Sequence, residues 1–401
     1  MAFDYTAYAP SSLATAVSAF LFVAIFNICV LTTTRSWARV AGVLVLAGLT
    51  GAFQASLRSW CVNKGWVSLL VTTAWTTYWH ALEMLLVSKV SASDIEEQAE
   101  KQYRPGTSLS RWQLALCTSS LLCKWRRIGT KWQIPNLPRF SPDGSVPSRA
   151  RFLFRSLLKI AGSYLMMSLF CVAPPPDPNL IAIGKEAYLF RADISVDERI
   201  FRMVSTIVFF INVALMVTMW YYLVCVVSVV LGLASPRDCP PFYGSLRDAY
   251  NLRGLWRNIH QGLRKCVSGP ADAFADSVLH LPRGTHASRC IRLILAFGIS
   301  AFIHAQADLA IGIPFAEAGQ FTFFSFQALG IVLESTLQEK CSRAGTDTLF
   351  PRGLQKGVGY IWVIYWFYWI TPTWSYTTMR TMDPVKDGMV IPAHYVATWF
   401  Q

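Results

Sequence analysis

Long apolar runs constrain this chain of 401 residues more than any other feature. A helix needs about 17 to 25 residues to cross a bilayer, and eight stretches at least this long are predominantly apolar. They are 12–34, 39–57, 66–88, 153–173, 203–234, 290–310, 318–335 and 357–375. Only 15% of the residues are charged, whereas roughly 25% is usual in a soluble domain. We therefore predict an all-α polytopic membrane protein with about eight transmembrane helices.

The apolar runs extend along the whole chain, which favours a single membrane domain over 1–401 rather than separate folding units. The stretch 203–234 is too long for one simple span, so we expect a tilted helix, a kinked helix or two short helices there. Between the third and fourth runs, 89–152 is polar and contains five prolines. We expect a cytosolic loop with one short amphipathic helix around 110–125.

The charge distribution predicts the topology. If the first helix starts on the lumenal side, the basic residues of the loops on the cytosolic side number 25, and those of the opposite loops number six. The first set of loops is 35–39, 89–152, 236–290 and 336–356, and the second is 58–65, 174–198, 311–317 and 376–388. The positive-inside rule produces such a difference. The net charge of +13 is thus explained by topology, and we expect no nucleic-acid partner.

The sixth apolar run contains an ionisable pair, His304 and Asp308. Residues four apart lie on the same face of a helix, so the carboxylate falls close to the imidazole. A neighbouring carboxylate raises the basicity of an imidazole, as a general base requires. On spacing alone, a histidine packed against a neighbouring helix explains the pattern equally well.

A second polar cluster lies in the loop that precedes this run. Its first part is Pro-Pro-Phe-Tyr-Gly at 240–244. After it, apolar residues recur at helical spacing over 251–267, with basic residues on the other side, which predicts one amphipathic helix on the membrane surface. A purely interfacial anchor does not account for Asn258, His260 and Gln261 within it.

Other polar or aromatic residues have simpler explanations. His80 and Glu83, in the third run, are expected to be structural, although they could line a cavity. The aromatic block 362–369 is typical of a membrane interface, and it could also form the wall of a hydrophobic pocket. The ten cysteines include no Cys-x-x-Cys pair, so we expect no metal site and interpret them as small apolar residues.

These motifs together resemble those of a known family. The similarity rests on the apolar spans, the 240–244 element, a Leu-Arg-x-Leu-Trp helix that leads to His-Gln, and an intramembrane Phe-x-His-x-x-x-Asp sequence. The chain is similar to the wax synthase-like branch of the membrane-bound O-acyltransferases. Within that branch it looks most like fungal acetyltransferases that modify terpenoids and meroterpenoids. The resemblance is most specific over 236–375, which would be the catalytic region.

The resemblance implies that His304 is the catalytic base, with Asp308 beside it, and that Asn258 or His260 is the second active-site residue. It implies transfer of acetyl from acetyl-CoA to a hydroxyl of a lipophilic secondary metabolite, in a membrane expected to be the endoplasmic reticulum. Acetyl-CoA would be a co-substrate that enters from the cytosol near Arg253 and Arg257, and no tightly bound cofactor is expected. The alternatives are a long-chain wax ester synthase and a proton-coupled transporter.

Overall fold

The computed structural model describes residues 5–32, 35–102, 109–172, 174–187, 194–259, 261–345 and 351–389. The regular secondary structure of these residues is entirely helical, which confirms the predicted all-α class. The chain divides into two compact units. The first unit comprises Met1–Pro135 and Gly262–Phe315, and the second comprises Asn136–Gln261 and Ala316–Gln401.

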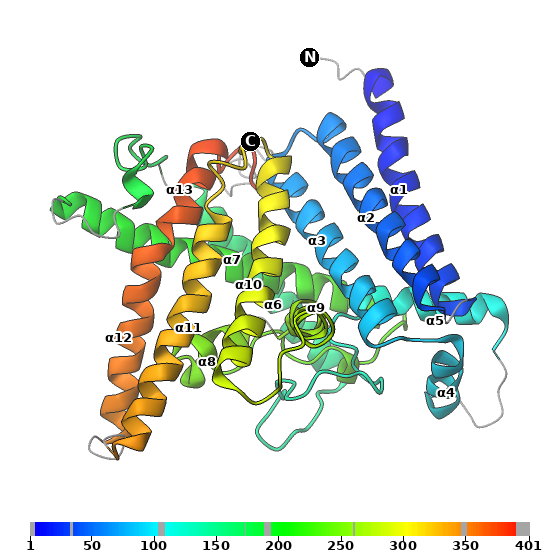
Figure 1. The fold of residues 1–401 in the computed structure, drawn as a ribbon. Helices are drawn as coiled ribbons and strands as arrows, with labels where there is room; N and C mark the ends of the chain where they lie inside the picture. Colours follow the sequence, from blue (N-terminus) through cyan, green and yellow to red (C-terminus); the bar gives the residue numbers. More distant parts are fainter. Residues whose placement is uncertain are drawn as a thin grey trace. The chain divides into compact units, whose positions relative to one another are not determined.

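The first unit is built on four long helices. They are α1 (Tyr5–Leu31), α2 (Ser36–Trp60), α3 (Lys64–Leu82) and α10 (His286–Ala310), joined by the shorter α4 (Ala92–Gln102), α5 (Arg111–Cys123) and α9 (Arg264–Ser277). Figure 1 shows α1, α2 and α3 side by side, with α9 and α10 against α3. The end at which α2 begins is also the end at which α10 begins. This arrangement agrees with the predicted alternation of loops.

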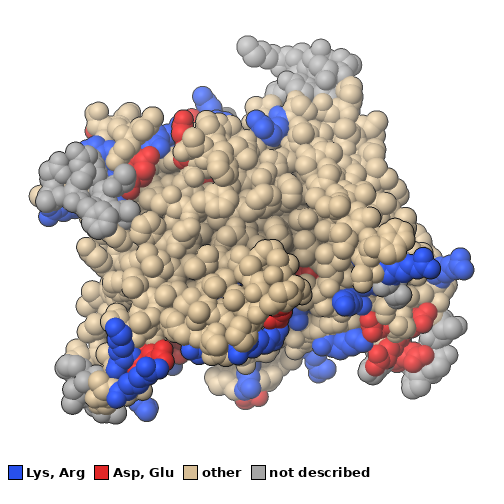
Figure 2. Space-filling view, viewed as in Figure 1, with Lys and Arg blue, Asp and Glu red and all other residues tan. Residues whose placement is uncertain are grey.

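Apolar contacts hold α1 against α2. Phe26 and Leu46 are fully buried, and a Cβ added at Gly42 would lie 2.4 Å from the Cys29 sulfur, so the Cys29 side chain would have to move. Small residues allow such a close approach of helices in a membrane, where packing rather than water exclusion drives association. The flank formed by these two helices carries charge at its ends and none between them on the face seen in Figure 2.

The second unit contains the other long helices. They are α6 (Arg149–Phe170), α7 (Val196–Val230), α11 (Gln320–Arg343) and α12 (Arg352–Ile370), with the shorter α8 (Leu252–Ile259) and α13 (Pro372–Thr381). The overlong run at 203–234 forms one continuous helix, α7, of 35 residues, about 52 Å at 1.5 Å per residue. A break separates α12 from α13 because Pro372 has no N–H to donate to the helix ladder.

Five of the described helices are long and apolar enough to cross a membrane: Pro10–Leu31 of α1, α2, α6, α7 and α10. The other three predicted spans also form helices, namely α3 continued by the π-helical turn η1 (Glu83–Val87), α11 and α12. These three do not combine the same length and apolar character, so the predicted count of eight is not confirmed. Their Trp, Tyr, Gln and Glu residues lower the mean hydropathy.

The predicted amphipathic helix over 251–267 is wrong in its extent. The structure has two helices here, α8 and α9, and the boundary between the two units falls between them. It is also more than a surface helix, because Leu252 and Asn258 of α8 are buried. The helical pattern of apolar residues continues from α8 into α9, so the pattern alone could not reveal that the sequence forms two helices here. The short helix expected around 110–125 is present as α5.

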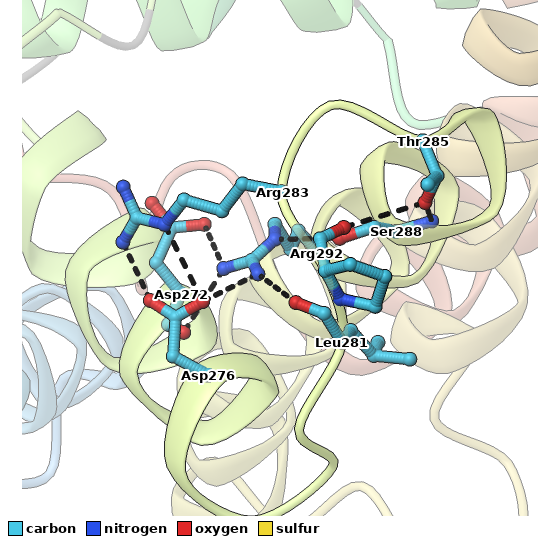
Figure 3. Close-up of polar contacts among 8 residues, drawn as sticks. Asp272, Asp276, Leu281, Arg283, Thr285, Ser288 and Arg292 are labelled. Carbon is cyan, nitrogen blue, oxygen red and sulfur yellow. Dashed lines mark hydrogen bonds and ion pairs between the residues drawn. The ribbon is translucent and has the colours of Figure 1, made fainter.

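Arg292 ties the start of α10 to α9. Its guanidinium donates to Asp276 Oδ1 at 2.5 Å, to the Asp272 carbonyl at 3.1 Å and to the Leu281 carbonyl at 3.2 Å. Its Nε also donates to Ser288 Oγ on the same helix at 3.0 Å. Figure 3 shows these contacts converging on one side chain. Arg292 therefore fixes the angle at which the chain enters α10.

Asp276 accepts a second charged partner in this cluster, Arg283, at 2.5 Å. Hydrogen bonds from Arg283, which has the larger effect, and from Arg292 lower the pKa of the Asp276 carboxyl to about 2. A carboxylate with a depressed pKa stabilises the fold above its unfolded pKa, about 3.9, and loses that effect as the pH falls through the folded value.

We predict that Asp276→Asn lowers the thermal unfolding midpoint of the detergent-solubilised protein by the same amount from pH 5 to 8. The difference from the parent protein should narrow below pH about 4 and vanish near pH 2. Intrinsic tryptophan fluorescence during heating measures both midpoints. A difference that disappears between pH 8 and 6 would contradict the assignment.

Candidate active site

The predicted pair His304 and Asp308 lies in the last third of α10, in the first unit. Asp308 is buried, and His304 is partly exposed. The helix is continuous through both residues, so they occupy the same face one turn apart, as predicted. The Asp308 carbonyl also accepts from Ile313 N at 3.0 Å, which closes the end of the helix directly after the pair.

Side chains of α2 and α3 hold this part of α10. Phe302 packs edge-on against Trp75 of α3, with ring centroids 5.0 Å apart. Trp75 Nε1 donates to Gln54 Oε1 of α2 at 2.7 Å, and Gln54 Nε2 donates to the Gln306 carbonyl at 3.2 Å. Three helices thus share one hydrogen-bonded chain, and it fixes the backbone on both sides of His304.

The other polar pair of the first unit, His80 and Glu83, is structural. His80 Nε2 lies 3.0 Å from the Leu121 carbonyl, and because a carbonyl only accepts, Nε2 carries the proton. Nδ1 then accepts from Arg127 Nη2 at 3.4 Å, and Arg127 forms an ion pair with Glu83. All three side chains are buried. An imidazole with both nitrogens engaged in this way is not available as a base.

In the second unit, the 240–244 element is anchored on α7. Tyr221 donates its hydroxyl to the Pro240 carbonyl at 2.6 Å, and Tyr243 donates to the Ala214 carbonyl at 3.4 Å. Burial raises the pKa of Tyr243, so its hydroxyl keeps the proton that it donates. The element is therefore a rigid support for whatever packs against it.

Asn258 packs against this element. Gly244 N donates to the Asn258 carbonyl at 3.1 Å, and a Cβ added at Gly244 would lie 3.0 Å from Asn258 Cγ and closer still to Oδ1. Asn258 is 7% exposed, and within the described residues its Nδ2 has no acceptor. A buried N–H without a partner costs about 1 to 3 kcal/mol. Such a donor is suited to an oxygen of a bound molecule.

The other predicted positions are placed as follows. Arg253 and Arg257 are exposed on α8, and Arg253 Nη2 donates to Ser335 Oγ of α11 at 3.0 Å. His260 lies outside the described residues. The aromatic block falls on α12, where Trp366 and Phe367 are buried and Tyr365 is exposed.

A polar stripe on α11 was not predicted from the sequence. Gln320, Gln327 and Glu334 are all buried, and Glu334 and Gln327 bind α8. The signal was present in the sequence, because the three residues recur every seven positions in the predicted span 318–335. That spacing is two helical turns and places all three on one face. Across the described part of the chain, no group of three metal-ligating side chains comes together.

Both polar positions lie within one segment that is similar to a known family. The model of the membrane bound O-acyl transferase family matches residues 239–326, which include Asn258 and His304. Acetyltransferase ataH of Aspergillus terreus is 30% identical over 68% of this chain and 92% of its own length. Acetyltransferase aurG of Calcarisporium arbuscula is 31% identical, with 76% and 74% covered, and acetyltransferase TRI7 of Fusarium sporotrichioides is 28% identical, with 70% and 67% covered.

The chain belongs to the membrane-bound O-acyltransferase family. This confirms the family resemblance inferred from the motifs, and it makes the protein an acyl-transferring membrane enzyme. The proton-coupled transporter is thereby set aside. Both units contribute to the matched segment, since 239–261 belongs to the second unit and 262–315 to the first.

We predict that Gly244→Ala lowers turnover about 10-fold or more, because the added methyl group displaces the Asn258 amide, and small errors of position are costly in catalysis. The measurement is the initial rate per amount of protein in membranes. Gly357→Ala is the matched control, since a Cβ at Gly357 meets nothing within 4 Å. Equal rates for Gly244→Ala and Gly357→Ala would show that turnover does not depend on the position of the Asn258 amide.

Proposed function

We propose that this protein transfers an acetyl group from acetyl-CoA to a hydroxyl of a lipophilic secondary metabolite of the terpenoid or meroterpenoid class. The observation that carries the proposal is the match to proteins named acetyltransferases, which includes relatives aligned over most of this chain. The endoplasmic reticulum membrane is the proposed location. A lipophilic alcohol would reach the enzyme from the bilayer.

His304 is proposed as the general base. An alcohol is a poor nucleophile at neutral pH, and it must lose its proton as it attacks the thioester carbonyl. The imidazole would take that proton, the new C–O bond would form, and the C–S bond would break to release CoA, which receives the proton. A positioned base contributes about 10² to 10⁴-fold in such a step. Asp308, one turn away, would bias the imidazole toward accepting the proton.

Asn258 is proposed to stabilise the oxyanion of the tetrahedral intermediate. Its buried Nδ2 has hydrogen-bonding capacity that no described residue uses, and removal of one such donor typically costs about 10² to 10³-fold in kcat. His260 is the alternative for this second role. The two residues are distinguished by comparison of Asn258→Ala with His260→Ala.

Acetyl-CoA is proposed to enter from the cytosolic side as a co-substrate. Arg253 and Arg257 are exposed basic residues on α8, close in sequence to Asn258, and could bind the phosphates of the donor. No tightly bound prosthetic group is needed for this chemistry. Membrane lipid surrounds the spans.

The function is tested with microsomes from a host that expresses the chain, incubated with labelled acetyl-CoA and hydroxylated terpenoids. Labelled ester is the expected product. If palmitoyl-CoA with a fatty alcohol gives ester and acetyl-CoA does not, the enzyme is instead a long-chain wax ester synthase.

We predict that His304→Ala lowers turnover at least about 10²-fold while the protein still accumulates in membranes, and that Asp308→Asn costs less. His286→Ala is the matched control, because His286 is exposed at the start of the same helix. Near-normal turnover of His304→Ala at normal protein level would refute the role of the base. If His304→Ala does not accumulate, His304→Gln retains a polar side chain and the same comparison applies.

We predict that Arg253→Ala and Arg257→Ala raise the KM for acetyl-CoA with little change in kcat, because charge at an entrance contributes to ground-state binding. Initial rates over a range of acetyl-CoA concentrations separate the two parameters. A fall in kcat at constant KM would instead assign these arginines to the chemical step.

A further inference from the structure

The helix that carries Asn258 depends on outside contacts for its stability. α8 has only eight residues, and isolated helices shorter than about 12 to 15 residues are marginal in water. Its first N–H groups have no partner within the helix. Asn251 Oδ1 accepts from Gly254 N at 2.6 Å, which satisfies one of them.

Glu334 of α11 satisfies another. Its carboxylate accepts from Leu252 N, at 2.8 Å through Oε1 and 3.1 Å through Oε2. Trp362 Nε1 of α12 also donates to Oε1 at 2.8 Å, which holds the carboxylate in place. The negative charge lies at the N-terminal end of α8, where the helix dipole favours an anion.

Two further contacts set the register of α8 on α11. Trp256 Nε1 donates to Gln327 Oε1 at 3.1 Å, one turn further along α8 and two turns back along α11 from Glu334. Between these points, Gly330 provides room for Leu252, because a Cβ there would lie 2.5 Å from Leu252 Cδ1. Leu252 and Trp256 are four residues apart and share the face that contacts α11.

This register determines where Asn258 lies. Asn258 is two residues after Trp256, about 200° further around the helix at 100° per residue. With the Trp256 face bound to α11, Asn258 lies on the opposite side, against Gly244. A rotation or fraying of α8 would move the Asn258 amide away from that position.

We propose that Glu334 is a positioning residue of this enzyme: by capping α8 from the neighbouring helix, it holds Asn258 where it acts. The inference rests on the proposed role of Asn258. Glu334 itself acts only through the backbone of α8.

The kinetic test uses Glu334→Ala and Glu334→Gln. Glu334→Ala should lower kcat about 10-fold or more, because it disturbs a group that acts in the transition state. The KM for acetyl-CoA should rise as well, since Arg253 and Arg257 lie on the same helix. Glu334→Gln keeps one acceptor oxygen for Leu252 N and should recover most of the activity. Glu339→Ala is the matched control, since Glu339 pairs with Arg343 at the exposed end of the same helix.

A double mutant distinguishes positioning from general damage. If Glu334 acts through Asn258, Glu334→Ala should add less than about twofold to the loss caused by Asn258→Ala. Losses that multiply would overturn the proposal. Equal activity of Asn258→Ala and the parent enzyme would instead refute the role of Asn258, and the contact between Glu334 and α8 would then be decided by the measurement below.

Hydrogen exchange tests the cap without any activity. Peptides that cover 250–259, analysed by mass spectrometry on the full-length protein in detergent, should exchange faster in Glu334→Ala than in the parent protein and in Glu339→Ala. The reason is that the Leu252 amide loses its acceptor and the first turn of α8 opens more often. Unchanged exchange over 250–259 would show that Glu334 does not hold α8 and would overturn the proposal, whatever the substrate of the enzyme.

Discussion

Three buried charges in this protein, those of Arg39, Arg202 and Glu334, bind backbone groups at the ends of helices and so tie neighbouring elements together. Arg39 donates to the Leu85 and Val90 carbonyls, where the chain leaves the π-helical turn. Arg202 donates to the Tyr368 and Trp369 carbonyls at the end of α12. Glu334 accepts from the first N–H of α8. Each sign matches the helix dipole, with cations at carbonyl ends and the anion at an N–H end.

This pairing follows from the medium. Inside a membrane or a buried core, an unsatisfied backbone group costs several kcal/mol, and so does an isolated charge. A charged side chain that binds a helix end satisfies the backbone group and gives the charge a partner in the same contact. Helix ends and breaks can therefore occur away from water in this chain, as at η1 and between α12 and α13.

The sequence was informative wherever a pattern was local. Each of the eight apolar runs is helical over most of its length, although the run 357–375 is divided between α12 and α13 at Pro372. The shared face of His304 and Asp308 followed directly from their spacing. The break between α8 and α9 could not be predicted, because apolar residues continue at helical spacing through it. The polar residues of α11 were present in the sequence at a regular spacing, but only the structure shows that two of them, Gln327 and Glu334, bind α8.

The two histidines of the apolar helices illustrate why residue type and burial alone do not identify a base. His80 is fully buried beside Glu83, which resembles the pairing of His304 with Asp308 in sequence. In the structure, the ion pair of Glu83 goes to Arg127, and the same guanidinium faces His80. A cation beside an imidazole disfavours its protonation, whereas a carboxylate favours it. Arg127, which lies in a loop some 40 residues further along the chain, is thus the residue that gives His80 a structural role.

The short length of α8 has a functional consequence. A long helix would fix Asn258 through its own hydrogen bonds, but an eight-residue helix takes its orientation from its neighbours. Those neighbours are of two kinds: α11, which binds one face through Gln327 and Glu334, and the 240–244 element, which supports Asn258 through Gly244. Gly244 and Glu334 are separated by 90 residues, but the position of the Asn258 side chain depends on both. Neither residue needs to touch a substrate for its replacement to alter catalysis.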